Sequence, residues 1–171
     1  MSTLRETFLQ ELADAYDFEK QLIKALPKMA KAAQNEELRE GFQEHLEETE
    51  EHARRLERIF EIFGEKPKTK KCTGIAGIIA EGEELIQKQA GDTALIGAAQ
   101  KVEHYEIAAY GTLKTWAENL HENDAADLLQ ETLQEEKDTD EKLTEAAENV
   151  LNDEETNQEK SQDQQARRKA A

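Results

Sequence analysis

Residues 15–26 read AYDFEKQLIKAL, and the apolar side chains of this stretch recur with the period of an α-helix. Extended back to residue 8, one face of that helix carries five apolar side chains: Phe8, Leu12, Ala15, Leu22 and Leu26. Glu19 lies in the middle of the same face. A bare buried carboxylate costs several kcal/mol unless it is protonated, paired or bound to a metal ion. The stretch therefore predicts a core helix whose carboxylate must be neutralised by something else in the fold.

The rest of the chain repeats this helical period. Four long helices are predicted, at about residues 3–33, 35–64, 92–120 and 123–150. A shorter apolar helix is predicted at residues 75–89, inside the long connection between the second and third. Short links join the first two long helices and the last two, so each pair should be antiparallel. The expected fold class is all-α: a ferritin-like antiparallel four-helix bundle with one long crossover that carries a short fifth helix.

Caps and the C-terminal composition set the expected limits of this bundle. Asn35 is the expected N-cap of the second helix, and Asp92 or Thr93 that of the third long helix. From about Asp153 the sequence is polar throughout, DEETNQEKSQDQQARRKAA. The sequence therefore predicts a bundle over residues 1–152 and a polar, disordered tail over residues 153–171.

Composition excludes several kinds of partner. The formal net charge is −17, from 39 acidic and 22 basic residues, which argues against nucleic acid and against an anionic membrane surface. No apolar run approaches the length of a membrane span, and the first residues lack the apolar region of a signal peptide. Cys72 is the single cysteine, so an intramolecular disulfide and a cysteine-based metal site are excluded. These features predict a cytoplasmic protein without a nucleic-acid or membrane partner.

An approximate internal repeat relates the two halves of the chain. A shift of 87 residues places Glu19 on Glu106 and Glu48 on Glu135. Within each half, 29 residues separate the two carboxylates. Two similar helical hairpins related by a pseudo-twofold axis would place these carboxylates at the same depth.

Every long helix contributes a carboxylate or a histidine to its apolar face. Glu106 repeats the position of Glu19, and Glu136 lies between core positions of the fourth helix. Several carboxylates at one level repel each other without a cation, whereas two divalent ions would neutralise four glutamates. Oxygen ligands with an imidazole suit iron or manganese. The candidate metal ligands are Glu19, His45, Glu48, Glu103, Glu106, Glu135, Glu136 and Asp140.

Structural alternatives exist for each of these residues. Glu19 and Glu106 would be tolerated if they paired with a lysine or a tyrosine. Glu48 and Glu135 lie at the edges of their apolar faces, where a solvated position also explains them, and a helical histidine is often only hydrogen-bonded. His52, Tyr16 and Tyr110 lie on or near the inner faces. The two tyrosines are either core residues, or they hydrogen-bond to the ligands or undergo one-electron oxidation. For His52, as for His45, the alternative to a role at the site is a histidine that is only hydrogen-bonded. The sequence leaves these alternatives open.

The chain resembles the YciF/YciE family of bacterial ferritin-like stress proteins over nearly all of residues 3–150. The segments that carry the resemblance are AYDFEKQLIKALPKMAKAA (15–33), HLEET (45–49), AAQKVEHYEIAAYGTL (98–113) and LLQETLQEEKDTDEKLT (128–144). The resemblance implies a homodimer with a dinuclear metal site. It implies as ligands Glu19, Glu48, Glu106 and one of Glu135 or Glu136, with His45, Glu103 and Asp140 in or just outside the coordination shell.

One signature of ferritin-like sites is missing. A Glu-x-x-His motif is absent, because Glu51 follows Glu48 at the third position and Asp138 follows Glu135. His45 instead precedes Glu48 by one turn, and a site with so little imidazole favours manganese or iron held more weakly. The expected function is a stress-response protein whose two-metal site acts on peroxide or dioxygen. The alternative is a non-catalytic structural or protective protein whose bundle mediates dimerisation. The helix at 75–89 either contributes to that dimerisation or packs on its own bundle.

Overall fold

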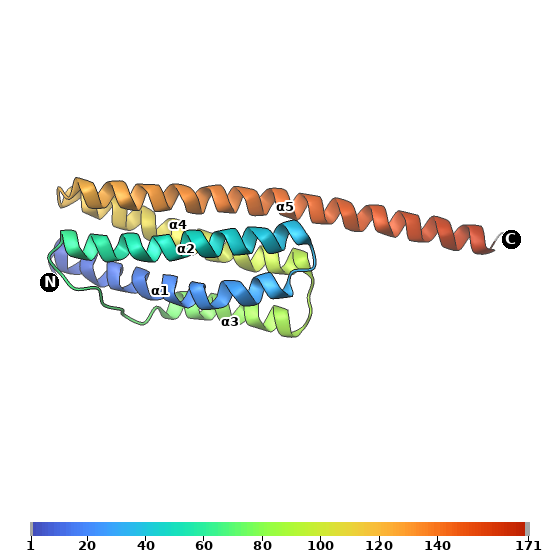
Figure 1. Cartoon of the computed structure of the whole chain (residues 1–171), viewed down its shortest axis with the longest axis horizontal. Helices are drawn as coiled ribbons and strands as arrows, with labels where there is room; N and C mark the ends of the chain where they lie inside the picture. The colour runs from blue at the N-terminus through green and yellow to red at the C-terminus, as the bar shows by residue number, and fades with distance from the viewer. Residues whose placement is uncertain (1, 170–171) are drawn as a thin grey trace.

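A computed structural model describes residues 2–169 of the chain, with side chains described for residues 2–152. Over that range the secondary structure consists of helices joined by loops, without strands (Figure 1). The helices are α1 (Leu4–Ala32), α2 (Glu36–Ile62), α3 (Thr73–Gln87), α4 (Asp92–Asn119) and α5 (Asn123–Lys169).

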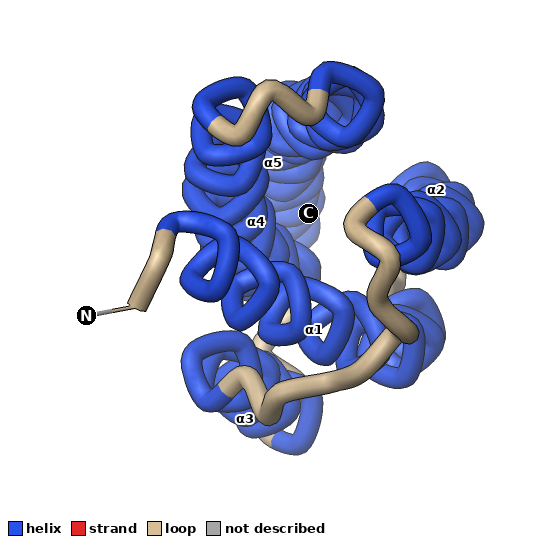
Figure 2. Tube along the Cα trace, turned by 90° about the vertical axis from the view of Figure 1, so that its left-hand side faces the viewer, coloured by secondary structure: helices blue, strands red, loops and turns tan. Residues whose placement is uncertain are grey.

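The four long helices form a closed ring of neighbours. α1 packs on α2 and α4 packs on α5, while α2 also contacts α5 and α1 also contacts α4 (Figure 1). The view along the bundle shows α3 outside this ring, beside α1 (Figure 2). α3 contacts α1 and α4, so the crossover covers one outer side of the bundle. The predicted four-helix bundle with a short helix in its crossover is confirmed.

Helix α3 packs on its own bundle through part of its apolar surface. Ile75 is fully buried, whereas Ile78 and Ile79 are half-buried against the core. These contacts explain the apolar composition of the crossover without a second copy of the chain. The homodimer therefore stays a prediction.

The start of α4 differs from the prediction. Gly91 is its N-cap, with φ of 88°, a left-handed conformation that glycine adopts without strain. The Asp92 carboxylate instead accepts hydrogen bonds from the backbone N–H groups of Gln34 (2.9 Å) and Asn35 (2.7 Å). Asp92 therefore joins α4 to the α1–α2 link, where these N–H groups would otherwise lack an acceptor. Asn35 caps α2 as predicted, its side chain accepting from the N–H of Leu38 (3.0 Å).

The apolar core is divided into two clusters. The larger one lies toward the α4–α5 turn and contains Phe8, Phe18, Leu56, Ile59, Phe60, Tyr110, Leu113 and Leu129. The smaller one lies toward the α1–α2 link and contains Leu26, Leu38, Phe42, Ile96, Ala99, Leu143 and Val150. Along α2, α4 and α5, buried polar side chains separate the two clusters. This polar layer is where the predicted site residues lie.

Two further predictions concern the ends and the surroundings of the bundle. Val150 is the last buried core residue of α5 within the described side chains. The predicted tail, residues 153–171, lies beyond the described side chains, so the division into bundle and tail stays a prediction. Among the described residues, none of the helices is both long enough and apolar enough to cross a membrane.

Candidate metal centre

Side chains from all four long helices meet in the polar layer. Glu19 comes from α1, His52 from α2, Glu106 from α4 and Glu136 from α5, and each is at most 1% exposed. Each lies on the helix face that carries its neighbours in the apolar core, so burying that face also buries the polar side chain. Glu103, one turn before Glu106, is 2% exposed.

These side chains form two overlapping groups of potential metal ligands. One consists of Glu19, His52 and Glu136, and the other of His45, Glu103, Glu106 and Glu136; within each group the ligand atoms lie within 4.8 Å of one another. Glu136 belongs to both groups, through different oxygen atoms. Its Oε1 lies 3.0 Å from His52 Nδ1, and its Oε2 lies 3.9 Å from His45 Nε2.

The inner layer holds polar atoms that lack a hydrogen-bond partner in the protein, although His52 Nδ1 and Glu136 Oε1 lie 3.0 Å apart as an ion-pair contact. Among the described side chains, buried atoms without a hydrogen-bond partner occur only in this layer: Glu19 Oε2, His52 Nδ1, Glu103 Oε2, both oxygens of Glu106 and both oxygens of Glu136. Buried polar groups normally find a partner, so a cluster of exceptions needs an explanation. Four carboxylates with two imidazoles are a donor set that suits divalent iron or manganese. The residues present fit a pair of such ions.

The electrostatics of the layer point the same way. Burial, reinforced by the charge of Glu136, raises the pKa values of Glu103 and Glu106 well above the usual range. Burial also raises the pKa of Glu19, to about 8, against an opposing effect of His52. Without a cation, burial therefore favours the protonated forms of these three carboxyl groups. Bound cations would favour their ionised forms.

His52 and Glu136 form the charged pair of the metal-free layer. Burial by itself lowers the pKa of His52, but its contacts with Glu135 and Glu136 outweigh burial and raise the pKa to about 10. Burial raises the pKa of Glu136, but the adjacent His52 and His45 hold it below its usual range. A metal ion at His52 Nδ1 would have to displace a proton.

The remaining candidate carboxylates border the layer and lie in neither group. Glu48 and Glu135 have side chains that are 35% and 31% exposed. Glu48 lies 3.3 Å from His45 Nδ1, and Glu135 lies 2.8 Å from His52 Nε2. The internal repeat thus places both at the same depth, each beside one histidine. The Asp140 side chain is 22% exposed and lies 3.5 Å from His104.

Glu135 is held in place by a buried arginine. Arg55 of α2 donates hydrogen bonds to both Glu135 oxygens, and also to Glu131 (3.0 Å) and Thr132 (3.2 Å). Burial raises the pKa of Glu135, but the hydrogen bonds from His52 and Arg55 lower it to about 2. An ionised Glu135 accepts the Nε2–H of His52 and leaves Nδ1 facing the inner carboxylates, the orientation that a metal-ligating histidine needs.

The two tyrosines near the layer differ in their partners. The Tyr110 hydroxyl donates a hydrogen bond to Glu19 Oε1, and its ring centroid lies 6.3 Å from that of His52. The Tyr16 hydroxyl donates instead to Glu57, outside the layer. Tyr110 is thus the tyrosine that touches a candidate ligand.

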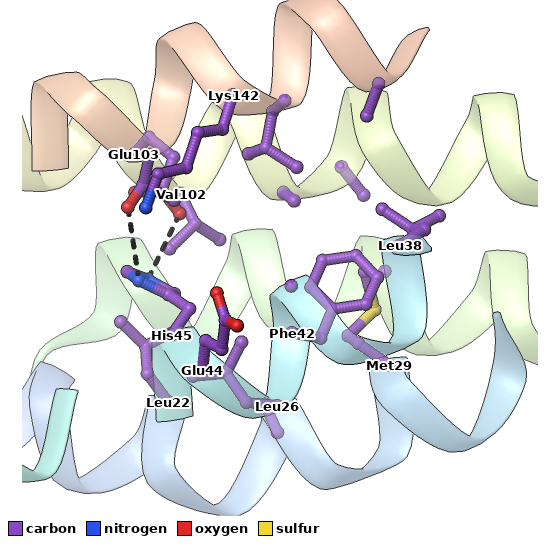
Figure 3. A pocket seen from close by; sticks show the side chains of 18 of the residues that line it. Leu22, Leu26, Met29, Leu38, Phe42, Glu44, His45, Val102, Glu103 and Lys142 are labelled. Atoms are coloured by element: carbon purple, nitrogen blue, oxygen red, sulfur yellow. Dashed lines mark hydrogen bonds and ion pairs between the residues drawn. The ribbon is translucent and has the colours of Figure 1, made fainter. Parts of the chain in front are cut away.

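A cavity of about 350 Å³ reaches the layer from the smaller core cluster. Its walls are mostly apolar, with Leu22, Leu26 and Phe42 among them, and His45 and Glu103 line it as well (Figure 3). Glu48 is also part of the lining. His45 Nε2 lies 3.4 Å from Glu103 Oε1 at this end of the layer. A small molecule in the cavity would approach the His45 side of the site.

Among the predicted residues, the structure brings together Glu19, His45, Glu103, Glu106 and Glu136, and it leaves Glu48, Glu135 and Asp140 at the border. The choice of ligands stays a prediction. His52 was placed on the inner face by its spacing, without an assigned role. The available signal was its position seven residues, two helical turns, after His45.

Comparison with known proteins places the chain. Residues 3–157 match the family described as a domain of unknown function, DUF892. The protein YciF of Escherichia coli K12 is 48% identical over 157 residues, which cover 89% of this chain and 95% of YciF. The chain belongs to the DUF892 family. The resemblance to YciF seen in the sequence is confirmed.

Solved structures agree with this membership. The crystal structure of the E. coli stress protein YciF matches with a TM-score of 0.84 at 48% identity, over 89% of this chain and 99% of that one. YcfI of Rhodopseudomonas palustris matches with a TM-score of 0.79 at 41% identity, over 84% and 94%. A dodecameric thioferritin of Bacteroides fragilis matches at 15% identity with a TM-score of 0.69, over 88% and 90%, which shows the ferritin-like fold alone.

Proposed function

We propose that this DUF892 protein is a ferritin-like stress-response protein that holds two divalent metal ions, iron or manganese, between its four long helices and acts on peroxide or dioxygen. The observation that carries the proposal is the pair of donor groups that share Glu136. A carboxylate that offers one oxygen to each group is suited to bridge two ions.

The charges support two ions rather than one. Glu19, Glu103, Glu106 and Glu136 supply four negative charges when ionised, and two divalent ions balance them. Iron or manganese bound there would supply a redox centre at which peroxide or dioxygen is reduced. The protein supplies the buried ligands, the cavity beside His45 and the partners that orient the histidines.

Glu48, Glu135 and Asp140 take a supporting part in this proposal. Glu135 orients His52 and Glu48 orients His45, each by accepting a hydrogen bond from the nitrogen that faces away from the inner carboxylates. Asp140 contributes negative charge near Glu103. The six inner ligands are then Glu19, His45, His52, Glu103, Glu106 and Glu136.

Metal content tests the proposal directly. Protein purified without chelators should contain close to two iron or manganese ions per chain by elemental analysis. The Glu136→Gln variant should lose both, because the shared ligand loses its charge. Glu141→Gln, an exposed position on the same helix, is the matched control and should retain both ions. A Glu136→Gln variant with full metal content would reject the assignment, and metal-loaded protein that consumes neither peroxide nor dioxygen would reject the chemistry.

A second function is favoured by a different observation. The raised pKa values of Glu19, Glu103 and Glu106 mean that the layer can also be neutralised by protons. A non-catalytic structural or protective protein, whose bundle mediates dimerisation, would need nothing more. In that case a chelator should leave the melting temperature unchanged at every pH. The first function requires that chelation lowers it at neutral pH.

The expected surroundings of the protein belong to the same proposal. We place it in the cytoplasm as a homodimer, with a small oxidant as substrate and without a nucleic-acid partner. The acidic composition supports this placement. Sedimentation equilibrium of the metal-loaded protein would give its oligomeric state.

A further inference from the structure

A line of contacting side chains leads outward from the Glu19 side of the metal centre. Its inner end is Tyr110, which is fully buried and whose hydroxyl donates to Glu19 Oε1. This tyrosine is the one aromatic side chain of the described residues whose hydroxyl bonds a candidate ligand. Tyr110 can lose an electron and its hydroxyl proton together, because Glu19 Oε1 already accepts a hydrogen bond from that hydroxyl.

Phe18 links Tyr110 to a second tyrosine. Its ring is buried between the two, 5.7 Å from the centroid of Tyr110 and 5.9 Å from that of Tyr105. Both contacts are edge-to-face, with interplanar angles of 89° and 88°. Aromatic pairs at these separations are in van der Waals contact. Tyr105 and Tyr110 are thus connected through one shared ring.

The outer end lies where the crossover loop enters α3. Tyr105 is half-buried, and its hydroxyl lies 3.1 Å from the sulfur of Cys72. A Cβ on Gly74 would come within 2.8 Å of the Tyr105 ring, so glycine at this position lets the ring lie against the start of α3. Burial raises the pKa of the Cys72 thiol. The hydrogen bond with Tyr105 lowers this pKa, whereas the nearby Asp14 carboxylate raises it.

The surface beside this end carries an unusual charge. Lys66, Lys68, Lys70 and Lys71 are exposed in the loop that precedes Cys72, in a chain of net charge −17. Lys70 also pairs with Asp14 at 3.4 Å. A small anion is attracted to this loop and repelled from most other parts of the acidic surface.

We propose that Tyr105, Phe18 and Tyr110 form a path for single electrons, from a small anionic reductant at the lysine loop to the metal centre. The inference rests on the proposed function, since peroxide would be the oxidant once the inner ligands hold their metal ions. Phe18 serves as a bridge, and the two tyrosines are the residues that are oxidised and reduced again.

The step balances in atoms and electrons. Tyr110 loses one electron to the centre while its hydroxyl proton moves to Glu19 Oε1. Tyr105 then reduces the Tyr110 radical through Phe18, and the proton returns from Glu19. The Tyr105 proton passes to the Cys72 sulfur as the thiol proton passes to Asp14, and both return when the reductant refills Tyr105. Two such passages with two protons convert one peroxide molecule into two water molecules and oxidise two molecules of reductant by one electron each.

The test uses iron-loaded protein, hydrogen peroxide and ascorbate as the anionic reductant. Electron paramagnetic resonance of samples frozen during turnover should show a tyrosyl radical that ascorbate removes. In Tyr105→Phe the radical should remain on Tyr110 and decay about tenfold more slowly with ascorbate, equivalent to about 1.4 kcal/mol in the barrier. In Tyr110→Phe no tyrosyl signal should form. Cys72→Ser keeps an acceptor near Tyr105 and should slow the decay less than Tyr105→Phe does.

Tyr16→Phe is the matched control, because Tyr16 is also buried and also bonded to a carboxylate but lies off the path. The yield of the tyrosyl radical and its decay with ascorbate should be the same in Tyr16→Phe as in the unmodified chain. Equal radical yield and decay in Tyr105→Phe, Tyr16→Phe and the unmodified chain would overturn the path while leaving the proposed function intact. Protein that binds no metal by elemental analysis would overturn both, so the two failures are distinguishable.

Discussion

Glu135 and Glu136 are neighbours in the sequence and have opposite surroundings. Glu136 is fully buried among the inner ligands, whereas the Glu135 side chain is 31% exposed and bonded to Arg55 and His52. Among the described side chains, histidines are the basic groups that contact the inner carboxylates, and the carboxyl groups of Glu19, Glu103 and Glu106 have raised pKa values. The pKa of Glu135 is lowered to about 2. One residue along α5, a rotation of about 100°, therefore separates a buried carboxylate whose pKa is lowered by His52 and His45 from a half-exposed one that Arg55 also holds.

The difference between the inner carboxylates and Glu135 should have its largest effect on how the free energy of unfolding of the metal-free protein depends on pH. Glu19 has a folded pKa of about 8 against an ordinary 4.5, so its protonated form stabilises the fold below pH 4.5 and this contribution is lost as pH rises to 8. The loss is at most on the order of 5 kcal/mol. His52 acts in the same direction between its ordinary 6.5 and about 10. Urea unfolding with chelator across this range would measure the loss.

Glu135 gives the opposite limb of the same curve. Its folded pKa of about 2 lies below the ordinary 4.5, so its contribution is present above pH 4.5 and is lost as pH falls to 2. Stability should therefore peak near pH 4.5, where the Glu135 contribution is complete and the loss from Glu19 begins. Glu19→Gln should flatten the alkaline limb and Glu135→Gln the acid limb. If both variants gave the same dependence of stability on pH, the distinction between the inner carboxylates and Glu135 would be contradicted.

The next largest effect is a difference of sign between two matched substitutions. In metal-free protein, Glu106→Leu should stabilise the fold by about 1–2 kcal/mol, because it replaces an unpaired buried carboxyl group with an apolar side chain. Glu135→Leu should destabilise it by about 2 kcal/mol, a value reduced for the partial exposure of Glu135, because Arg55 and His52 lose their partner. Chemical denaturation at pH 6 with chelator compares the two. Destabilisation by both would show that Glu106 has a partner in the folded chain.

A smaller effect concerns the orientation of His52. Glu135→Gln keeps the size of the side chain but no longer accepts the Nε2–H as an ion, so metal affinity should fall by about 10- to 100-fold. Calorimetric titration with Mn²⁺ measures this change, and nitrogen NMR of the metal-free protein reports the tautomer of His52. Exposed Glu141→Gln is again the control. Unchanged affinity together with an unchanged tautomer would remove Glu135 from the site.

The smallest effects are expected at the other border carboxylates. Glu48→Gln removes a partner of His45, at 3.3 Å, which is a longer contact than that of Glu135 with His52. Asp140→Asn removes only a nearby charge. Each should weaken Mn²⁺ binding by less than about tenfold, below the loss expected for Glu135→Gln. A larger loss in either variant would place that residue among the ligands.

Much of the site could be predicted because the helical period is a local property. Glu19 and Glu106 interrupt apolar faces that are visible in single stretches of sequence, and both are buried. The repeat correctly suggested that Glu48 and Glu135 occupy equivalent depths. It could not show that this depth is the border of the layer, because a helix edge becomes buried or exposed according to how close its neighbour packs.

Other features depend on groups far apart in the chain. Sequence left Glu135 and Glu136 undecided, and the difference between their surroundings comes from Arg55, which is 80 positions from Glu135 and donates hydrogen bonds to it. The prediction that Asp92 or Thr93 caps α4 is wrong, because Gly91 is the N-cap. The carboxylate oxygens of Asp92 instead accept hydrogen bonds from the backbone N–H groups of the α1–α2 link. The role of His52 was open because its partners come from α1 and α5.

By itself the amino-acid sequence determined the helices, their pairing, the family and the presence of acidic side chains on faces that must be buried. These follow from periodicity and from short links, which act within one or two elements. Only the tertiary structure decided which acids face each other, which are held by Arg55, and which remain without a partner. The physical reason is that the free energy of a charge depends on its distance from other charges and from water, and the packing of four helices sets both.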